Sequence, residues 1–138
     1  MSDLGWQDVS SRSISVDIHG QEMLIGGTEK PWIGTHPEFG ELDDRFRLLL
    51  SHTPDNYSWA QQNGMDLILA GHNHGGQVVL PVVGPVYSPS LHGCRNASGV
   101  YYSDPSLMFV SRGISGRHPL RIRCRPEVSL IRLKCKSN

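Results

Sequence analysis

Two short apolar stretches, and the residues that follow each of them, restrict the fold of this chain more than any other feature. Phe46–Ser51 and Leu67–Ala70 are apolar enough to be strands that are buried on both faces. The segment between them, 55–63, is typical of a short helix that Asp55 or a neighbour caps and that Gly64 ends. Strand, helix and strand make a βαβ unit, and its crossover makes the two strands parallel.

Histidines follow both predicted strands. His52 comes directly after the first strand, and His72 and His74 come after the second. Because parallel strands end at the same edge of a sheet, where α/β proteins hold their ligands, we expect the three imidazoles to meet there. If the backbone of 72–74 stays extended, His72 and His74 also project to the same side. Three glycines around them let the main chain adopt unusual dihedrals and approach a ligand: Gly71, Gly75 and Gly76.

These residues resemble two metal-ligand motifs of the calcineurin-like metallophosphoesterases. Segment 48–55, Leu-Leu-Leu-Ser-His-Thr-Pro-Asp, is similar to the family's His-x-Pro-Asp motif, and 65–77 is similar to its Gly-His-x-His signature. The Gly-Gly-Gln ending and segment 111–135 are most similar to the bacterial members described as membrane-associated phosphoesterases. The resemblance extends over about 13–135.

The resemblance implies an α/β, strand-rich fold that is the C-terminal half of a four-layer α/β/β/α sandwich. Family members carry Asp-x-His, Gly-Asp and Gly-Asn-His segments before the part that matches here. Those segments supply the carboxylate that bridges two metals, an asparagine ligand and the histidine that protonates the leaving group. We expect them to be missing, so 1–138 is predicted to be a single partial domain without its N-terminal half, and no catalytic residue is assigned.

For the site, the resemblance implies that His52 and His72 bind one metal and His74 binds the other. Imidazole ligands suit manganese, iron or zinc. The intact domain is expected to hold two ions, but three neutral ligands do not offset two dications, so at most one is expected here. Asp55 and Asp66 are candidates to orient the ligating imidazoles. Their alternative roles are a helix cap for Asp55 and a solvated strand end for Asp66.

Two functions stay open at this point. One is the C-terminal part of a metal-dependent phosphoesterase, which hydrolyses phosphate mono- or diesters at a dinuclear metal centre and is inactive as this fragment. Its partners would be a phosphate-ester substrate and the missing N-terminal half. The other is a non-catalytic remnant that folds and binds at most one metal ion.

The charge distribution and the cysteines indicate which partners and which redox compartment to expect. The net charge is zero, but eight of the thirteen basic residues fall in 112–136, and arginines alternate with other residues in 121–125. That pattern is typical of a solvated strand face or of peripheral contact with an anionic membrane. No aromatic residues interleave with the arginines, so no nucleic-acid partner is expected. The three cysteines form no Cys-x-x-Cys pair, which favours inert thiols in a reducing compartment.

The sequence was also searched for a membrane-spanning segment. No apolar run of about 18 residues is present, so no transmembrane segment is predicted. The default location is cytoplasmic, or membrane-associated if the missing N-terminus carried an anchor.

Alternating patterns predict a hairpin of 13–18 and 22–27 and a helical turn at 41–45. Segment 92–106 is expected to be irregular, and further strands are expected at 76–80, 107–111, 120–124 and 128–134.

Overall fold

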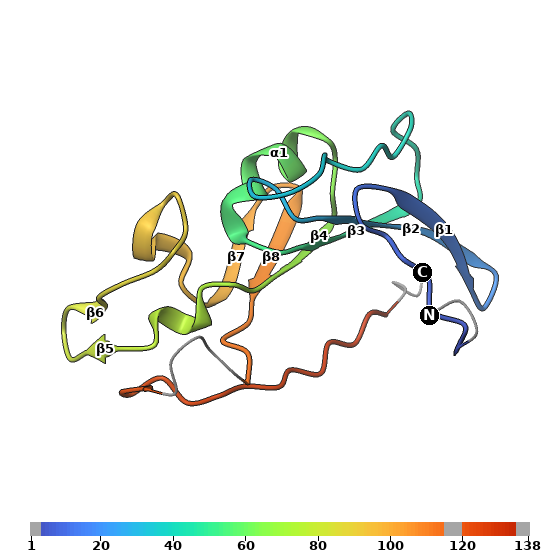
Figure 1. Ribbon diagram of the computed structural model, residues 1–138. Coiled ribbons are helices and arrows are strands. Elements are labelled where there is room, and N and C mark those ends of the chain that lie inside the picture. The colour runs from blue at the N-terminus through green and yellow to red at the C-terminus, as the bar shows by residue number, and fades with distance from the viewer. Residues whose placement is uncertain (1–3, 115–119, 135–138) are drawn as a thin grey trace.

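One mixed sheet of six strands organises the molecule. The computed structural model describes residues 4–114 and 120–134. The strands follow the order β1-β2-β3-β4-β8-β7, of which β2, β3, β4 and β8 run parallel to one another while β1 and β7 are antiparallel edge strands (Figure 1). Their bounds are β1 Ser13–Ile18, β2 Gln21–Thr28, β3 Phe46–Ser51, β4 Leu67–Ala70, β7 Gly99–Ser103 and β8 Ser106–Val110.

The predicted βαβ unit is confirmed as β3, α1 and β4, with β3 and β4 pairing in parallel. Its helical part is shorter than expected. A 3₁₀ turn, Pro54–Asn56, leads into α1, Tyr57–Gln62. The cap of the turn is Thr53, whose side chain accepts a hydrogen bond from the backbone N–H of Asp55. Smaller elements follow β4: the 3₁₀ turns His74–Gly76 and Gly93–Asn96 and a two-stranded sheet of β5 (Val79–Leu80) and β6 (Gly84–Pro85).

Parallel pairing brings four loops to one edge of the sheet. Gly27 lies opposite Leu50, and Leu50 lies opposite Leu69, so β2, β3 and β4 end nearly level. β8 pairs in parallel with β4 and ends at the same level. The segments that leave after Thr28, Ser51, Ala70 and Val110 therefore share one edge, which we call the carboxyl edge.

The core lies between the sheet and α1. Leu49, Ile68 and Met108 are fully buried and belong to one cluster with Ala60 of α1. The opposite face of the sheet carries a smaller cluster of Met23, Leu48 and Leu67. Leucines on this second face remain partly exposed, and within 4–114 and 120–134 no helix covers them (Figure 1).

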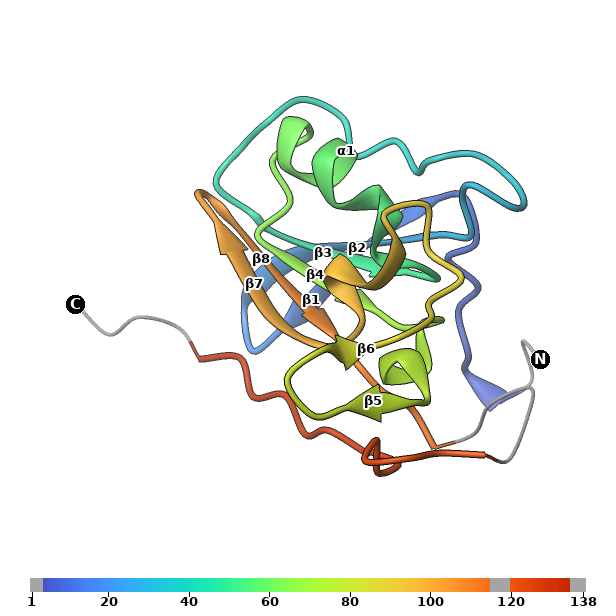
Figure 2. The same cartoon turned by 90° about the vertical axis from the view of Figure 1, so that its left-hand side faces the viewer.

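The final segment differs most from the prediction. Residues 120–124 and 128–134 are not strands; a single bridge joins Ile122 to Val78. Arg123 has φ +54°, a left-handed conformation that interrupts an extended backbone, and Pro126 lacks the N–H that a strand ladder needs. The segment runs along the side of the sheet away from α1 in both views (Figures 1 and 2).

Other sequence-based boundaries are also corrected. Segment 41–45 forms no helical turn, the strand expected at 76–80 is reduced to β5, and 92–106 contains β7 rather than irregular structure alone. The strand-rich α/β class is confirmed. In the described ranges it comprises one large sheet with a helix on one face, and the second sheet layer of a four-layer sandwich is not among these residues. No helix within them has the length and apolar character needed to cross a membrane.

Candidate metal site

His52 and His72 come together at the carboxyl edge. They follow β3 and β4, and their ring centroids lie 4.5 Å apart with the ring planes tilted by 47°. The backbone N–H of His52 donates to the carbonyl of Thr28, which fixes this histidine against the end of β2 at 2.9 Å. Twenty positions apart in sequence, the two imidazoles meet because parallel strands bring both loops to one edge.

One ring nitrogen of His72 is left without a partner by the part of the chain that the structure describes. This atom, Nε2, is buried and makes no hydrogen bond there. Burial lowers the pKa of His72, and the nearby His52 and His74 lower it further, while Asp55 opposes the shift. A lowered pKa keeps the ring neutral at a pH where an ordinary histidine begins to protonate, and a neutral ring offers the lone pair that a metal requires.

His74 lies in the same loop, but the backbone is not extended as expected. His72 has φ +70° and His74 has φ +49°, and the chain turns tightly, with the N–H of Gly76 donating to the carbonyl of Asn73 at 2.8 Å. Left-handed conformations are costly for residues with a Cβ and concentrate at functional sites. In the two described ranges, no group of three or more His, Cys, Asp or Glu side chains is arranged to hold a metal. The structure thus brings His52 and His72 together as a pair.

Two of the three glycines are required by the shape of the loop. Gly75 and Gly76 have φ +65° and +77°, and a Cβ on Gly76 would lie 2.6 Å from Cβ of Pro85. A Cβ on Gly75 would lie 2.5 Å from Sγ of Cys124. Gly71 differs, because the nearest atom to its Cβ position would be the His52 carbonyl oxygen at 4.0 Å. Gly71 therefore has neither a positive φ nor a close neighbour at its Cβ position, and a side chain would fit there.

The C-terminal segment supports the histidine loop, a role that the sequence did not indicate. Cys124 is buried, and its Sγ donates to the carbonyl of His74 at 3.2 Å. Arg121 donates to the same carbonyl at 3.4 Å and to the Arg112 carbonyl at 3.0 Å. Ile122 donates to the carbonyl of Gln77 at 2.9 Å. One of the three cysteines and one of the alternating arginines thus hold the loop in place.

The two aspartates occupy different places. The carboxylate of Asp55 accepts hydrogen bonds from the Ser90 hydroxyl and from the backbone N–H of Leu91, so it anchors the loop after β6. Asp66 precedes β4, and its carboxylate accepts from the backbone N–H of Arg47 at 2.7 Å. That position is at the opposite end of β4 from His72, roughly 15–20 Å away by strand rise. The structure does not bring Asp66 to the histidines.

The letters of an Asp-x-His segment do occur in the chain, contrary to the expectation that the motif is missing. Asp17 and His19 lie at the turn between β1 and β2, where the Asp17 carboxylate accepts from the N–H of Gly20 at 3.1 Å. The turn precedes β2, so it lies at the edge opposite His52, roughly 25–30 Å away by strand rise. Asp17 and His19 form a hairpin turn and are not metal ligands of this edge.

An aromatic residue at the carboxyl edge was not singled out from the sequence. The ring of Trp32, in the loop after β2, has its centroid 5.7 Å from that of His72, and the planes are tilted by 51°. Trp32 is still 52% exposed. Only the parallel order of β2, β3 and β4 brings a residue forty positions upstream beside His72.

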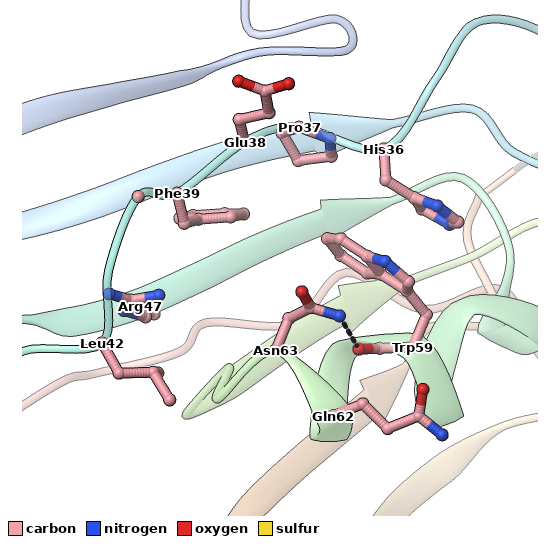
Figure 3. A pocket seen from close by; sticks show the side chains of 10 residues that line it. His36, Pro37, Glu38, Phe39, Leu42, Arg47, Trp59, Gln62 and Asn63 are labelled. Carbon is pink, nitrogen blue, oxygen red and sulfur yellow. Dashed lines mark hydrogen bonds between the residues drawn. The ribbon is translucent and has the colours of Figure 1, made fainter.

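A separate hollow lies on the helix side of the sheet. Its volume is about 530 Å³, and its walls include Phe39, Leu42, Arg47 and Trp59 (Figure 3). His36 stacks on Trp59 at 4.1 Å between centroids and hydrogen-bonds the Asn56 amide at 3.0 Å, so it is a packing residue. None of His52, His72 and His74 lines this hollow, and it is not the site that the motifs predict.

Comparison with known proteins gives the family. The chain is 36% identical over 114 residues to phosphodiesterase YaeI of Escherichia coli, covering 82% of this chain and 42% of that protein. It is 38% identical over 121 residues to metallophosphoesterase YkuE of Bacillus subtilis, covering 83% of this chain and 42% of that protein. This chain belongs to the calcineurin-like metallophosphoesterase family.

A third relative has a named substrate. UDP-2,3-diacylglucosamine pyrophosphatase LpxG of Chlamydia trachomatis is 32% identical over 92 residues, covering 62% of this chain and 28% of that protein. No family model matches the chain, and no solved structure gives a significant match. The chain spans less than half the length of these metallophosphoesterase relatives.

The residues present fit part of a divalent-metal site. His52 and His72 supply two adjacent imidazoles, and the buried Nε2 of His72 has no hydrogen-bond partner among residues 4–114 and 120–134. Two imidazoles are an incomplete ligand set, because metal sites of this kind use at least three protein ligands. Any further ligands would have to be added to this pair.

Proposed function

We propose that this chain forms the histidine side of a metal-dependent phosphoesterase site, within one partial domain spanning 1–138. The observation that carries the proposal is the His52–His72 pair, with ring centroids 4.5 Å apart at the carboxyl edge of a parallel sheet. Family membership supports phosphate mono- or diesters as the substrate class. The buried Nε2 of His72, which no described residue hydrogen-bonds, supports a divalent cation as its partner.

Imidazole chemistry favours manganese, iron or zinc over magnesium or calcium. His52 and His72 would hold the ion, and His74 is the proposed ligand of a second ion in a complete dinuclear centre. Bound there, a divalent metal would polarise a phosphoryl oxygen of the ester. The chain's own contribution is to present these imidazoles at the carboxyl edge, with His72 and His74 on a loop held by Cys124 and Arg121.

We further propose that the 138-residue polypeptide alone does not turn over. A bridging carboxylate and a general acid are needed, and a general acid is typically worth about 10²–10⁴-fold in rate. Both carboxylate oxygens of Asp55 accept hydrogen bonds, from Ser90 and Leu91, and Asp66 lies at the end of β4 remote from the histidines, so we propose neither as the bridge. These missing groups would come from a further segment or a second polypeptide.

Titration calorimetry with zinc and manganese tests the proposal. One ion should bind to the wild-type chain, and His52→Ala and His72→Ala should each weaken binding by about tenfold or more. His19→Ala is the matched control, because His19 lies at the hairpin turn on the opposite edge of the sheet. Equal losses for His19→Ala and His52→Ala would place the binding elsewhere.

The non-catalytic alternative is separated by a rate measurement. With manganese present, the 138-residue chain should hydrolyse bis(p-nitrophenyl) phosphate no faster than manganese alone does. Restored turnover on addition of a polypeptide with the remaining family motifs would support the enzymatic role. A chain that binds the ion and never gains activity in such mixtures would support a remnant.

A further inference from the structure

The indole of Trp32 lies beside His72 at the carboxyl edge of the sheet. It follows β2, and β2 is the direct neighbour of β3, which carries His52. Its centroid is 5.7 Å from that of His72, so the two rings are in contact range while half of the indole surface stays exposed. Among the described residues the indole is therefore accessible from the side that His72 does not cover.

The Trp32 loop is held firmly at its first turn. Trp32 and Ile33 both donate from their backbone N–H to the carbonyl of Glu29, at 3.1 and 3.3 Å. The hydroxyl of buried Thr28 accepts from the N–H of Lys30 at 3.2 Å. These bonds close a tight turn directly after β2, so the indole is carried by a fixed backbone.

A second anchor ties this loop to the histidine loops. The side chain of Asn56 is buried, and its amide donates to the Lys30 carbonyl at 2.9 Å and to the Ser51 hydroxyl at 2.9 Å. Its amide oxygen is 3.0 Å from Nε2 of His36, further along the same loop. Ser51 directly precedes His52, so one amide fixes the position of the Trp32 loop relative to His52.

We propose that Trp32 is a stacking surface for the leaving group, and that it selects phosphate esters that carry a planar ring. An exposed indole on a fixed turn offers a flat π-surface, and planar rings pack on such surfaces with offset or edge-on geometry. Ile33, which is 67% exposed, extends the apolar surface next to it. The inference rests on the proposed function, because it places the phosphate at His52 and His72.

A pair of small esters tests the inference on the 138-residue chain loaded with zinc. Phenyl phosphate and methyl phosphate carry the same phosphate group, and only phenyl phosphate carries a ring. By calorimetry the wild-type chain should bind phenyl phosphate about fivefold to tenfold more tightly. Trp32→Ala should remove this preference and leave methyl phosphate affinity unchanged, whereas Trp32→Phe should retain most of it.

Trp6→Ala serves as the matched control, since Trp6 is 72% exposed on the N-terminal segment and should not alter the preference. Equal weakening of both esters by Trp32→Ala, or an unchanged preference, overturns the role of Trp32. The zinc affinity of each preparation is measured first. Zinc binding without a ring preference contradicts only this inference, while a wild-type chain that binds no zinc contradicts the proposed function and the inference with it.

Discussion

Gly75 and Cys124 pack so closely that a Cβ on Gly75 would lie 2.5 Å from the cysteine sulfur. Forty-nine positions separate them in sequence, yet the contact joins the loop that carries His72 and His74 to the C-terminal segment. Cys124 also donates to the carbonyl of His74 at 3.2 Å. The geometry of the predicted metal loop is therefore held by a segment with no metal-ligand motif of its own.

Gly75→Ala should destabilise the fold by about 2 kcal/mol or more, because it combines left-handed backbone strain with a steric clash. Gly71→Ala is the matched control, with open space around its Cβ position, and it should cost less than about 0.5 kcal/mol. Urea unfolding of both variants measures the difference. In the double variant Gly75→Ala/Cys124→Ala, relief of the clash should recover part of the loss, and strict additivity would argue against this contact.

The two faces of the sheet should respond differently to truncation. Leu49 is fully buried under α1, so Leu49→Ala should cost about 3–5 kcal/mol. Leu50 is its direct neighbour on the helix-free face and is 38% exposed, so Leu50→Ala should cost only about 1 kcal/mol. Chemical denaturation compares the two. The helix-free face should also bind an apolar dye, and Leu50→Lys should reduce the dye signal. Similar unfolding losses at both leucines would contradict the greater exposure of Leu50.

Acid should weaken the anchor at Asp55. Burial raises its pKa, but hydrogen bonds from Ser90 and Leu91 lower it more, and the net pKa lies below the ordinary value. A depressed pKa contributes stability that is present above the unfolded pKa of about 3.9 and is lost as pH falls through the lower folded value. Asp55→Asn should therefore flatten the fall of unfolding free energy below about pH 4.

Ser90→Ala is the companion variant for Asp55, since it removes one donor and keeps the carboxylate. It should shift the acid transition in the same direction by a smaller amount. Unfolding free energies measured from pH 6 downward for the wild type and both variants test this. An unchanged pH profile in Asp55→Asn would mean that the carboxylate contributes nothing to acid stability.

Asp66→Ala should affect folding and not metal binding. The carboxylate accepts from the N–H of Arg47 at the end of β4 remote from the histidines, and loss of such a hydrogen bond costs about 1–2 kcal/mol. Zinc affinity, measured where the variant is still folded, should equal that of the wild type. A tenfold weaker affinity would restore the predicted role of Asp66 as an orienter of the histidine ligands.

Some features followed from the sequence because they depend on local patterns. The apolar runs of β3 and β4 and the segment between them predicted the βαβ unit, and the hairpin of β1 and β2 appears at nearly the predicted bounds. The approach of His52 to His72 followed from the same pattern, because a crossover requires parallel strands and parallel strands share an edge. Short-range periodicity and chain connectivity were enough for these.

Only the tertiary structure fixed the conformation of the histidine loop and the contacts between distant segments. The left-handed turn at His72 and His74 replaced the expected extended backbone, because the loop is held by Cys124 and Arg121 from about fifty residues away. The position of Trp32 beside His72 depended on β2 pairing with β3, which no local pattern specifies. The sequence by itself determined which residues end the central strands. Contacts between distant segments decided how those residues face one another, because strand order and loop packing come from long-range burial and hydrogen bonding.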